Sequence, residues 1–231
     1  MIGLYITSAL TLLAGTISSY LYSKQKHTLR LIFKSLASLL FCATGLLAIL
    51  LSRTFSVYSL GVMAALILGL VGDIFLCLDS LLPEEKSKML MNGIGLLAFL
   101  AGHVFFIIIF MQKAPFKLQT LPIILIIPLL FLFAHKLRLI NSPKSVVIPC
   151  LVYGMFLGLT VTSTVSLYLT ERSLAHLIAL FAALLFTISD STLVIRFFSV
   201  SNERKNYILM YVVLFSYYMA QSLFAITIIL N

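Results

Sequence analysis

The chain has 231 residues, of which 61% are hydrophobic and only 10% are charged, with a mean hydropathy of +1.14. Soluble globular domains carry about 25% charged residues, so this composition excludes a soluble domain. The net charge is +9, but no tail rich in Lys or Arg is present, so the basic residues indicate membrane-flanking anchors and not a nucleic-acid-binding surface.

Apolar runs of about 18 residues or more predict transmembrane helices, and this sequence contains eight of them, joined by short connections. We therefore predict an all-α fold, in which residues 1–231 form a single bundle of eight transmembrane helices. Pro122, Pro128 and Pro149 fall inside the fifth and sixth spans, and we expect them to bend these helices. The predicted spans are 2–22, 33–51, 57–78, 89–111, 118–135, 146–168, 174–197 and 207–230.

The basic residues alternate between the loops in a way that predicts the orientation of the bundle. Of the 16 Lys and Arg residues, 12 lie in or next to the odd-numbered loops and only 4 in the even-numbered loops. Loops rich in Lys and Arg stay in the cytoplasm. We therefore expect the odd-numbered loops on the cytoplasmic side of a bacterial inner membrane and both termini outside.

Two short stretches suggest an internal duplication. The third span ends in GDIFLCLD and the seventh in SDSTLVIR, and both spans are predicted to run from outside to inside. Each stretch carries an acid about six residues before a terminal charge. A repeat of residues 1–112 in residues 113–231 is therefore a hypothesis.

Acids inside two of the spans are the most informative residues of the sequence. An ionised acid at the centre of a bilayer costs about 2.5 to 3.5 kcal/mol, so such a residue usually faces the bundle interior and has a function. Asp73 lies in the third span, and Asp79 follows it by six residues, about 9 Å along a helix, at the expected cytoplasmic interface. Asp79 is either a residue that binds or orients the substrate or a solvated helix end. The alternative for Asp73 is a structural ion pair, for which Lys34 or His103 would be the partner.

Asp190 in the seventh span is predicted to lie at a depth similar to that of Asp73, about two turns from the cytoplasmic end of its helix. Two acids that approach each other away from water keep one proton between them at neutral pH. One is then a proton donor and the other a carboxylate, which is the requirement for acid–base catalysis. We predict Asp73 and Asp190 as a catalytic pair.

Further polar residues in the spans are candidates for substrate binding or orientation. Asn92 and His103 are eleven residues apart, so they share one face of the fourth helix, about 16 Å from each other. Gln221 follows Tyr217 by four residues and Tyr218 by three, so that either tyrosine can share a helix face with it. Each of these side chains also has an ordinary interpretation as an interhelical hydrogen bond.

Lys34 and Ser189 each have two interpretations. Lys34 opens the second predicted span, where it either marks the topology or binds an anionic lipid phosphate. Ser189 adjoins Asp190 and either donates a hydrogen bond to it or packs between helices. The histidines and cysteines show no HxxxH, HExxH or CxxC spacing, so we predict no metal site and no cofactor.

Five stretches of the sequence, spread in order over nearly the whole chain, resemble the YhhN-like family of membrane lysoplasmalogenases. They are FKSL (Lys34), GDIFLCLD (Asp73), FLAGHVFF (His103), LLFTISDSTL (Asp190) and YYMAQSL (Tyr217, Gln221). The sequence departs from the family pattern at Ser35, where proline often follows the lysine. It also departs at Phe106, where tyrosine often stands three residues after the histidine. Neither departure affects the acids.

The resemblance implies hydrolysis of the vinyl-ether bond of lysoplasmalogens, which releases a fatty aldehyde and glycerophosphocholine or glycerophosphoethanolamine. Such hydrolysis begins with protonation of the β-carbon and leaves an oxocarbenium ion that water attacks, so it needs a proton donor and a carboxylate. Asp73 and Asp190 would supply both. His103 and Tyr217 would orient the enol-ether oxygen or the water, and Lys34 would bind the phosphate at the cytoplasmic mouth.

Three other functions fit parts of this pattern. A proton-coupled transporter of small molecules or lipids would also contain intramembrane acids and a histidine, although paired Gly/Pro-broken helices at matching positions are absent from the sequence. An intramembrane aspartyl protease would need YD and GxGD motifs, of which GLVGD is a partial match. The third is a non-catalytic lipid-binding or scaffold protein. The partners expected for the hydrolase are a lysophospholipid substrate and membrane lipid, with no nucleic acid.

Overall fold

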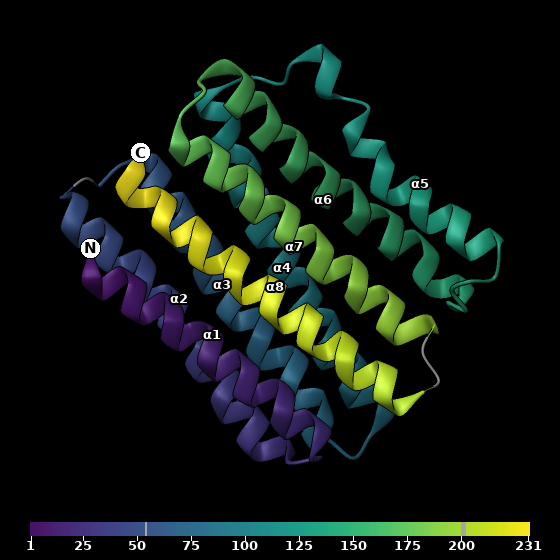
Figure 1. Ribbon diagram of the computed structural model, residues 1–231. Helices are drawn as coiled ribbons and strands as arrows, with labels where there is room; N and C mark the ends of the chain where they lie inside the picture. Colours follow the sequence, from purple (N-terminus) through teal and green to yellow (C-terminus); the bar gives the residue numbers. More distant parts are fainter. Residues whose placement is uncertain (54, 200–201) are drawn as a thin grey trace.

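The computed structural model describes residues 1–53, 55–199 and 202–231 (Figure 1). Within these residues eight helices are long and apolar enough to cross a membrane, and no strand is present, which confirms the predicted fold class. The helices are α1 (Ile2–Ser23), α2 (His27–Ser52), α3 (Val57–Leu78), α4 (Glu85–Lys113), α5 (Ile123–Lys136), α6 (Lys144–Thr170), α7 (Leu174–Ser199) and α8 (Glu203–Leu230). Short 3₁₀ turns follow α3 and precede α5, at Asp79–Leu81 and Leu118–Thr120.

Helix α2 begins at His27, six residues before the predicted start of the second span. Polar residues end a hydropathy run, but they do not end a helix, because the backbone hydrogen bonds continue through them. Lys34 therefore does not open α2, as the sequence suggested. It lies seven residues, about 10 Å, inside the helix and is buried.

The fifth span agrees in extent with its prediction, at Leu118–Lys136, but it is not one continuous α-helix. Residues 118–120 form a separate 3₁₀ turn, and Pro122 stands at the N-cap of α5 and not inside it. Proline is tolerated at the start of a helix, because the backbone N–H that it lacks would have no helical partner there. Pro128 and Pro149 do lie inside α5 and α6, as predicted.

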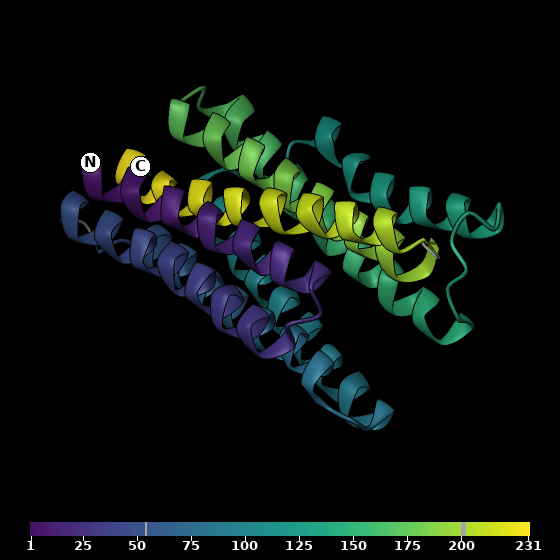
Figure 2. The same ribbon diagram turned by 60° about the horizontal axis from the view of Figure 1, so that its bottom comes forward.

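Helix α8 lies in the middle of the bundle, and it packs against α1, α2, α3 and α7 (Figures 1 and 2). Helix α5 lies at the outer edge and packs chiefly on α6. These two helices approach closely at Gly158, where a Cβ atom would lie 2.5 Å from the Ile124 carbonyl oxygen. Large apolar side chains cover much of the outer surface, as expected for helices that face lipid. The chain is therefore an integral membrane protein.

Both termini lie at the same end of the bundle (Figure 1). The opposite end contains the last turns of α1, α3, α5 and α7 and the first turns of α2, α4, α6 and α8, and thus the odd-numbered loops that are rich in Lys and Arg. The internal duplication stays a prediction.

Candidate active site

A cavity of about 240 Å³ lies near the end of the bundle opposite to the termini. Its wall is formed by α2, α3, α4, α7 and α8, together with the end of α1 and the 3₁₀ turn at Asp79–Leu81. Asp73 on α3 and Asp190 on α7 both line this cavity, although they are far apart in the sequence. The structure therefore brings the two predicted acids to the same space.

Asp73 is buried, with 2% of the residue exposed, and its carboxylate has two partners on α2. Lys34 Nζ lies 3.0 Å from Asp73 Oδ1, and Ser38 Oγ donates a hydrogen bond to Asp73 Oδ2 at 2.6 Å. Lys34 and Ser38 are four residues apart, so they project from the same face of α2. An ammonium group and a hydroxyl donor together compensate a carboxylate that bulk water does not reach.

Of the two structural partners that the sequence offered for Asp73, the structure contains Lys34 and not His103. The Lys34 side chain is itself 5% exposed, and its amine faces the carboxylate. This pairing disfavours the role that we expected for Lys34 at the phosphate of a lipid, because the charge is already balanced inside the protein.

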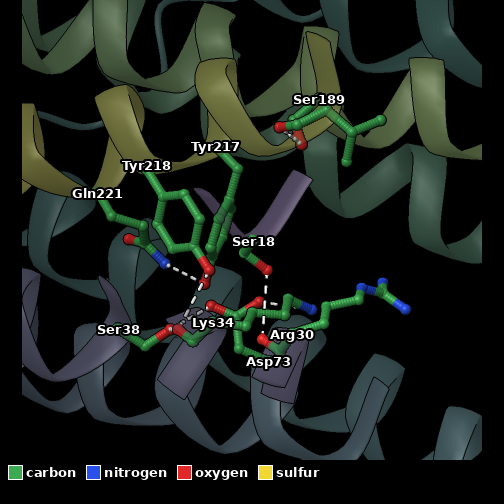
Figure 3. A network of polar contacts seen from close by, with 10 residues as sticks. Ser18, Arg30, Lys34, Ser38, Asp73, Ser189, Tyr217, Tyr218 and Gln221 are labelled. Carbon is green, nitrogen blue, oxygen red and sulfur yellow. Dashed lines mark hydrogen bonds and ion pairs between the residues drawn. The ribbon is translucent and has the colours of Figure 1, made fainter. Parts of the chain in front are cut away.

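Helix α8 brings Tyr217, Tyr218 and Gln221 to this ion pair. The Tyr218 hydroxyl donates to the Lys34 carbonyl oxygen at 3.2 Å, and Gln221 Nε2 donates to the Tyr217 hydroxyl at 3.0 Å. Figure 3 shows both tyrosine side chains pointing from α8 toward Asp73. Of these three residues, Tyr217 is the one that lines the cavity.

Gly69 on α3 makes room for the polar side chains of α8. A Cβ atom at this position would collide with Gln221 Nε2 and would lie 2.9 Å from the Tyr217 hydroxyl oxygen. The absence of a side chain at Gly69 is therefore what allows α8 to place these groups beside Asp73.

Asp190 has surroundings different from those of Asp73. It is half-buried, and the Tyr153 hydroxyl on α6 donates to Asp190 Oδ2 at 2.5 Å. Among the described residues no Lys, Arg or His lies at ion-pair distance from Asp190, and no direct hydrogen bond joins the two aspartates. The neighbouring Ser189 donates to the Val213 carbonyl oxygen of α8 at 3.0 Å, which is the helix-packing interpretation of this residue.

His103 is buried in α4 and does not line the cavity. Thr160 on α6 donates its single hydroxyl proton to the Phe156 carbonyl oxygen at 2.9 Å, so its oxygen accepts from His103 Nδ1 at 3.0 Å. An imidazole with its proton on Nδ1 has a lone pair on Nε2, and this buried atom has no hydrogen-bond partner among the described residues.

Aromatic rings connect His103 with the cavity wall. The Phe186 ring centroid lies 4.5 Å from that of His103 and 5.4 Å from that of Tyr217. His103 therefore contacts the site through the packing of its ring against Phe186.

Asn92 and Asp79 form a separate contact at the mouth. Asn92 Nδ2 donates to Asp79 Oδ2 at 3.4 Å, and Asp79 lines the cavity. These two residues are thus placed near the entrance and apart from the ion pair of Lys34.

Two residues of this site were not found from the sequence. Ser38 could have been found, because it lies one helical turn after Lys34 on the same face. Tyr153 carries no such signal, since a tyrosine within an apolar span is ordinary. Within the described part of the chain, no group of three His, Cys, Asp or Glu side chains lies close enough to hold a metal ion.

A cavity with two acids at one end of an eight-helix bundle defines a polytopic membrane protein with a candidate acid–base site. A comparison with known protein families matches the YhhN family over residues 29–228, so the chain belongs to the YhhN family. Searches of curated proteins and of solved structures gave no match. The family agrees with the resemblance drawn from the motifs and is consistent with a hydrolase.

Proposed function

We propose that this protein is a lysoplasmalogenase that hydrolyses the vinyl-ether bond of alkenylglycerophosphocholine or alkenylglycerophosphoethanolamine. The observation that carries the proposal is that Asp73 and Asp190 line one cavity but have different partners. Membership of the YhhN family supports the same reaction. The substrate is then a lysophospholipid, and it reaches the cavity from the surrounding membrane.

The different partners of the two acids suggest which one is the proton donor and which one is the carboxylate. Asp73 faces the Lys34 ammonium, which balances a negative charge, so Asp73 is the carboxylate of the pair. Asp190 has no cation at ion-pair distance within the described chain, and a carboxyl group without a cation is least costly in a membrane when it carries its proton. Asp190 is therefore the proton donor in this proposal.

The reaction follows from this division. The Asp190 proton adds to the β-carbon of the vinyl ether, the C=C π electrons form the new C–H bond, and an oxocarbenium ion remains. The Asp73 carboxylate stabilises this cation and accepts a proton from the water that attacks it. The Asp190 carboxylate takes the hydroxyl proton of the resulting hemiacetal, the bond to the glycerol oxygen breaks, and that oxygen takes the proton from Asp73, so both acids return to their starting states. The products are a fatty aldehyde and a glycerophosphodiester, and no metal or cofactor takes part.

Purified protein in detergent tests the proposal with lysoplasmalogen as substrate and released aldehyde as the readout. We expect Asp73→Asn and Asp190→Asn to lower kcat by at least about 100-fold, because proton transfer by a positioned group contributes roughly 10²–10⁴-fold. Glu171→Gln is the matched control, since Glu171 is exposed at the other end of the bundle. Aldehyde release at the wild-type rate in both aspartate variants would refute the mechanism. Proton-coupled uptake into vesicles without aldehyde release would instead support the transporter alternative.

The charge pattern supports an orientation in a bacterial inner membrane with both termini outside and the cavity open toward the cytoplasmic leaflet. A C-terminal alkaline phosphatase fusion tests it. We expect the phosphatase fusion to be active and the corresponding green fluorescent protein fusion to be non-fluorescent. The opposite result would show that the C-terminus lies in the cytoplasm.

A further inference from the structure

Two arginines from opposite parts of the sequence meet at the cavity. Arg30 lies in the first turn of α2 and Arg196 in the last turn of α7, and both line the cavity. Their guanidinium carbons lie 4.7 Å and 5.3 Å from the ring centroid of Tyr22, which also lines it. One aromatic ring therefore holds two cationic groups close to each other.

These guanidinium groups lack anionic partners. Within the described chain, neither arginine has a carboxylate at ion-pair distance. Buried nitrogens without a hydrogen-bond partner among the described residues occur in both side chains, at Arg30 Nε and at Arg196 Nε and Nη1. Arg30 is only 6% exposed, so bulk water does not replace these bonds freely. A buried donor without a protein partner is costly unless water or a ligand supplies the acceptor.

The other charged groups of the cavity are engaged. Lys34 pairs with Asp73 at 3.0 Å, and Lys88 pairs with Glu85 at 2.6 Å. The Asp79 carboxylate accepts from Asn92. The two arginines are thus the cations of this cavity that remain for a ligand. The guanidinium fork matches the oxygen atoms of a phosphate, which it binds through two parallel hydrogen bonds.

We propose that Arg30 and Arg196 form a subsite for the phosphate of a lysophospholipid, an inference that rests on the proposed function. Figure 3 shows the Arg30 side chain extending away from the Asp73 network. Lys34 then balances Asp73, and the arginines take the phosphate role that the sequence suggested for Lys34.

The spacing along α7 agrees with this assignment. Arg196 follows Asp190 by six residues, which corresponds to about 9 Å along the helix. In a lysoplasmalogen the phosphorus and the vinyl-ether carbons are separated by about 8 Å of extended chain, at the reach per bond of an extended backbone. The rise between the two residues is thus similar in size to the separation of the phosphate and the vinyl ether in the substrate.

Two substrates distinguish a phosphate subsite from a structural role of the arginines. We expect Arg30→Gln and Arg196→Gln each to raise KM for lysoplasmalogen about tenfold, the loss expected for a charge-assisted hydrogen bond, with kcat nearly unchanged. Hydrolysis of the matching alkenylglycerol, which has no phosphate, should not change. The exposed Arg138, at the same end of the bundle, gives the control Arg138→Gln. Equal losses on both substrates, or none, would overturn the subsite.

A binding measurement separates this inference from the proposed function. Thermal unfolding of the wild type and both variants is followed with lysophosphatidylcholine, glycerophosphocholine, monoacylglycerol or inorganic phosphate. We expect lysophosphatidylcholine to raise the Tm of the wild type more than monoacylglycerol does, and this difference to disappear in both variants. If the difference appears without any hydrolysis, the proposed function fails and the subsite stands. A lysophospholipid subsite would be refuted if monoacylglycerol raised the Tm of the wild type as much as lysophosphatidylcholine does. It would also be refuted if inorganic phosphate raised the Tm by as much as lysophosphatidylcholine.

Discussion

Lys34 and Asp73 form an ion pair of 3.0 Å inside the bundle, with only 4% and 2% of the two residues exposed. Lys34 lies on α2 and Asp73 on α3, so the pair also connects two helices. Because bulk water does not reach these charges, each group depends on the other for its compensation. The pair is therefore a unit of both stability and proposed catalysis, and the two contributions can be separated by mutation.

Lys34→Met should destabilise the protein by about 3–5 kcal/mol, because it leaves the Asp73 carboxylate buried without a cation. The double variant Lys34→Met/Asp73→Asn should recover most of this loss, since no charge remains, but it should stay inactive. Thermal unfolding in detergent, together with aldehyde release, measures both effects. Lys26→Met, at an exposed position, is the control. A double variant no more stable than Lys34→Met alone would show that the loss of stability does not come from the unpaired Asp73 carboxylate.

Tyr153→Phe should lower kcat about 10- to 100-fold with little change in KM. The variant removes the hydroxyl that donates to Asp190 Oδ2 at 2.5 Å and so removes the hydrogen bond that orients this carboxyl group. Tyr5→Phe, at an exposed position of α1, is the control and should behave as the wild type. Wild-type kinetics of Tyr153→Phe would show that Asp190 does not need this donor.

The spans and the meeting of two acids could be predicted from the sequence, because both follow from the cost of placing polar groups in a membrane. Hydropathy shows which residues of α3 and α7 cross the membrane. The charges of the loops predict that these helices run in the same direction, so Asp73 and Asp190 come to a similar depth. These arguments need only the positions of residues along the helices.

The partners of the acids could not be predicted in the same way, because they depend on how the helices are rotated and where they begin. Lys34 was expected at the membrane surface, but α2 starts at His27, so the lysine lies deep enough to reach Asp73. Tyr153 gave no signal, since only the packing of α6 against α7 brings it to Asp190. Helix boundaries and rotations are set by tertiary packing, which hydropathy does not report.

Gly69→Ala should lower both stability and activity. The added methyl group collides with Gln221 Nε2 and lies 2.9 Å from the Tyr217 hydroxyl oxygen, so α8 has to move away from α3. Overpacking of this kind costs about 1–3 kcal/mol. The control Gly93→Ala adds the same methyl group to α4, where no heavy atom lies within 4 Å of it. Alanine favours a helix by about 0.5–1 kcal/mol over glycine, so Gly93→Ala should stabilise the protein. Equal effects of the two substitutions would argue against the collision.

Thr160→Val tests the hydrogen bond that fixes the His103 ring. The Thr160 hydroxyl lies 3.0 Å from His103 Nδ1, while Nε2 already has no partner among the described residues. Valine has nearly the same shape as threonine but accepts no hydrogen bond, so both ring nitrogens would be left without partners. We expect a loss of about 1–3 kcal/mol in the free energy of unfolding. If His103 orients the reacting groups through Phe186, kcat should fall as well, while KM should change little.

Thr162→Val is the matched control for this experiment, because it removes a buried hydroxyl from the same helix. The Thr162 hydroxyl donates to the Gly158 carbonyl oxygen of its own helix at 2.7 Å, a bond that leaves no other side chain unpaired when it is lost. The control should therefore cost less than about 1 kcal/mol, in the range of an ordinary hydrogen bond. Similar losses of stability in the two variants would show that the contact with His103 contributes nothing beyond the bond of a threonine to its own helix.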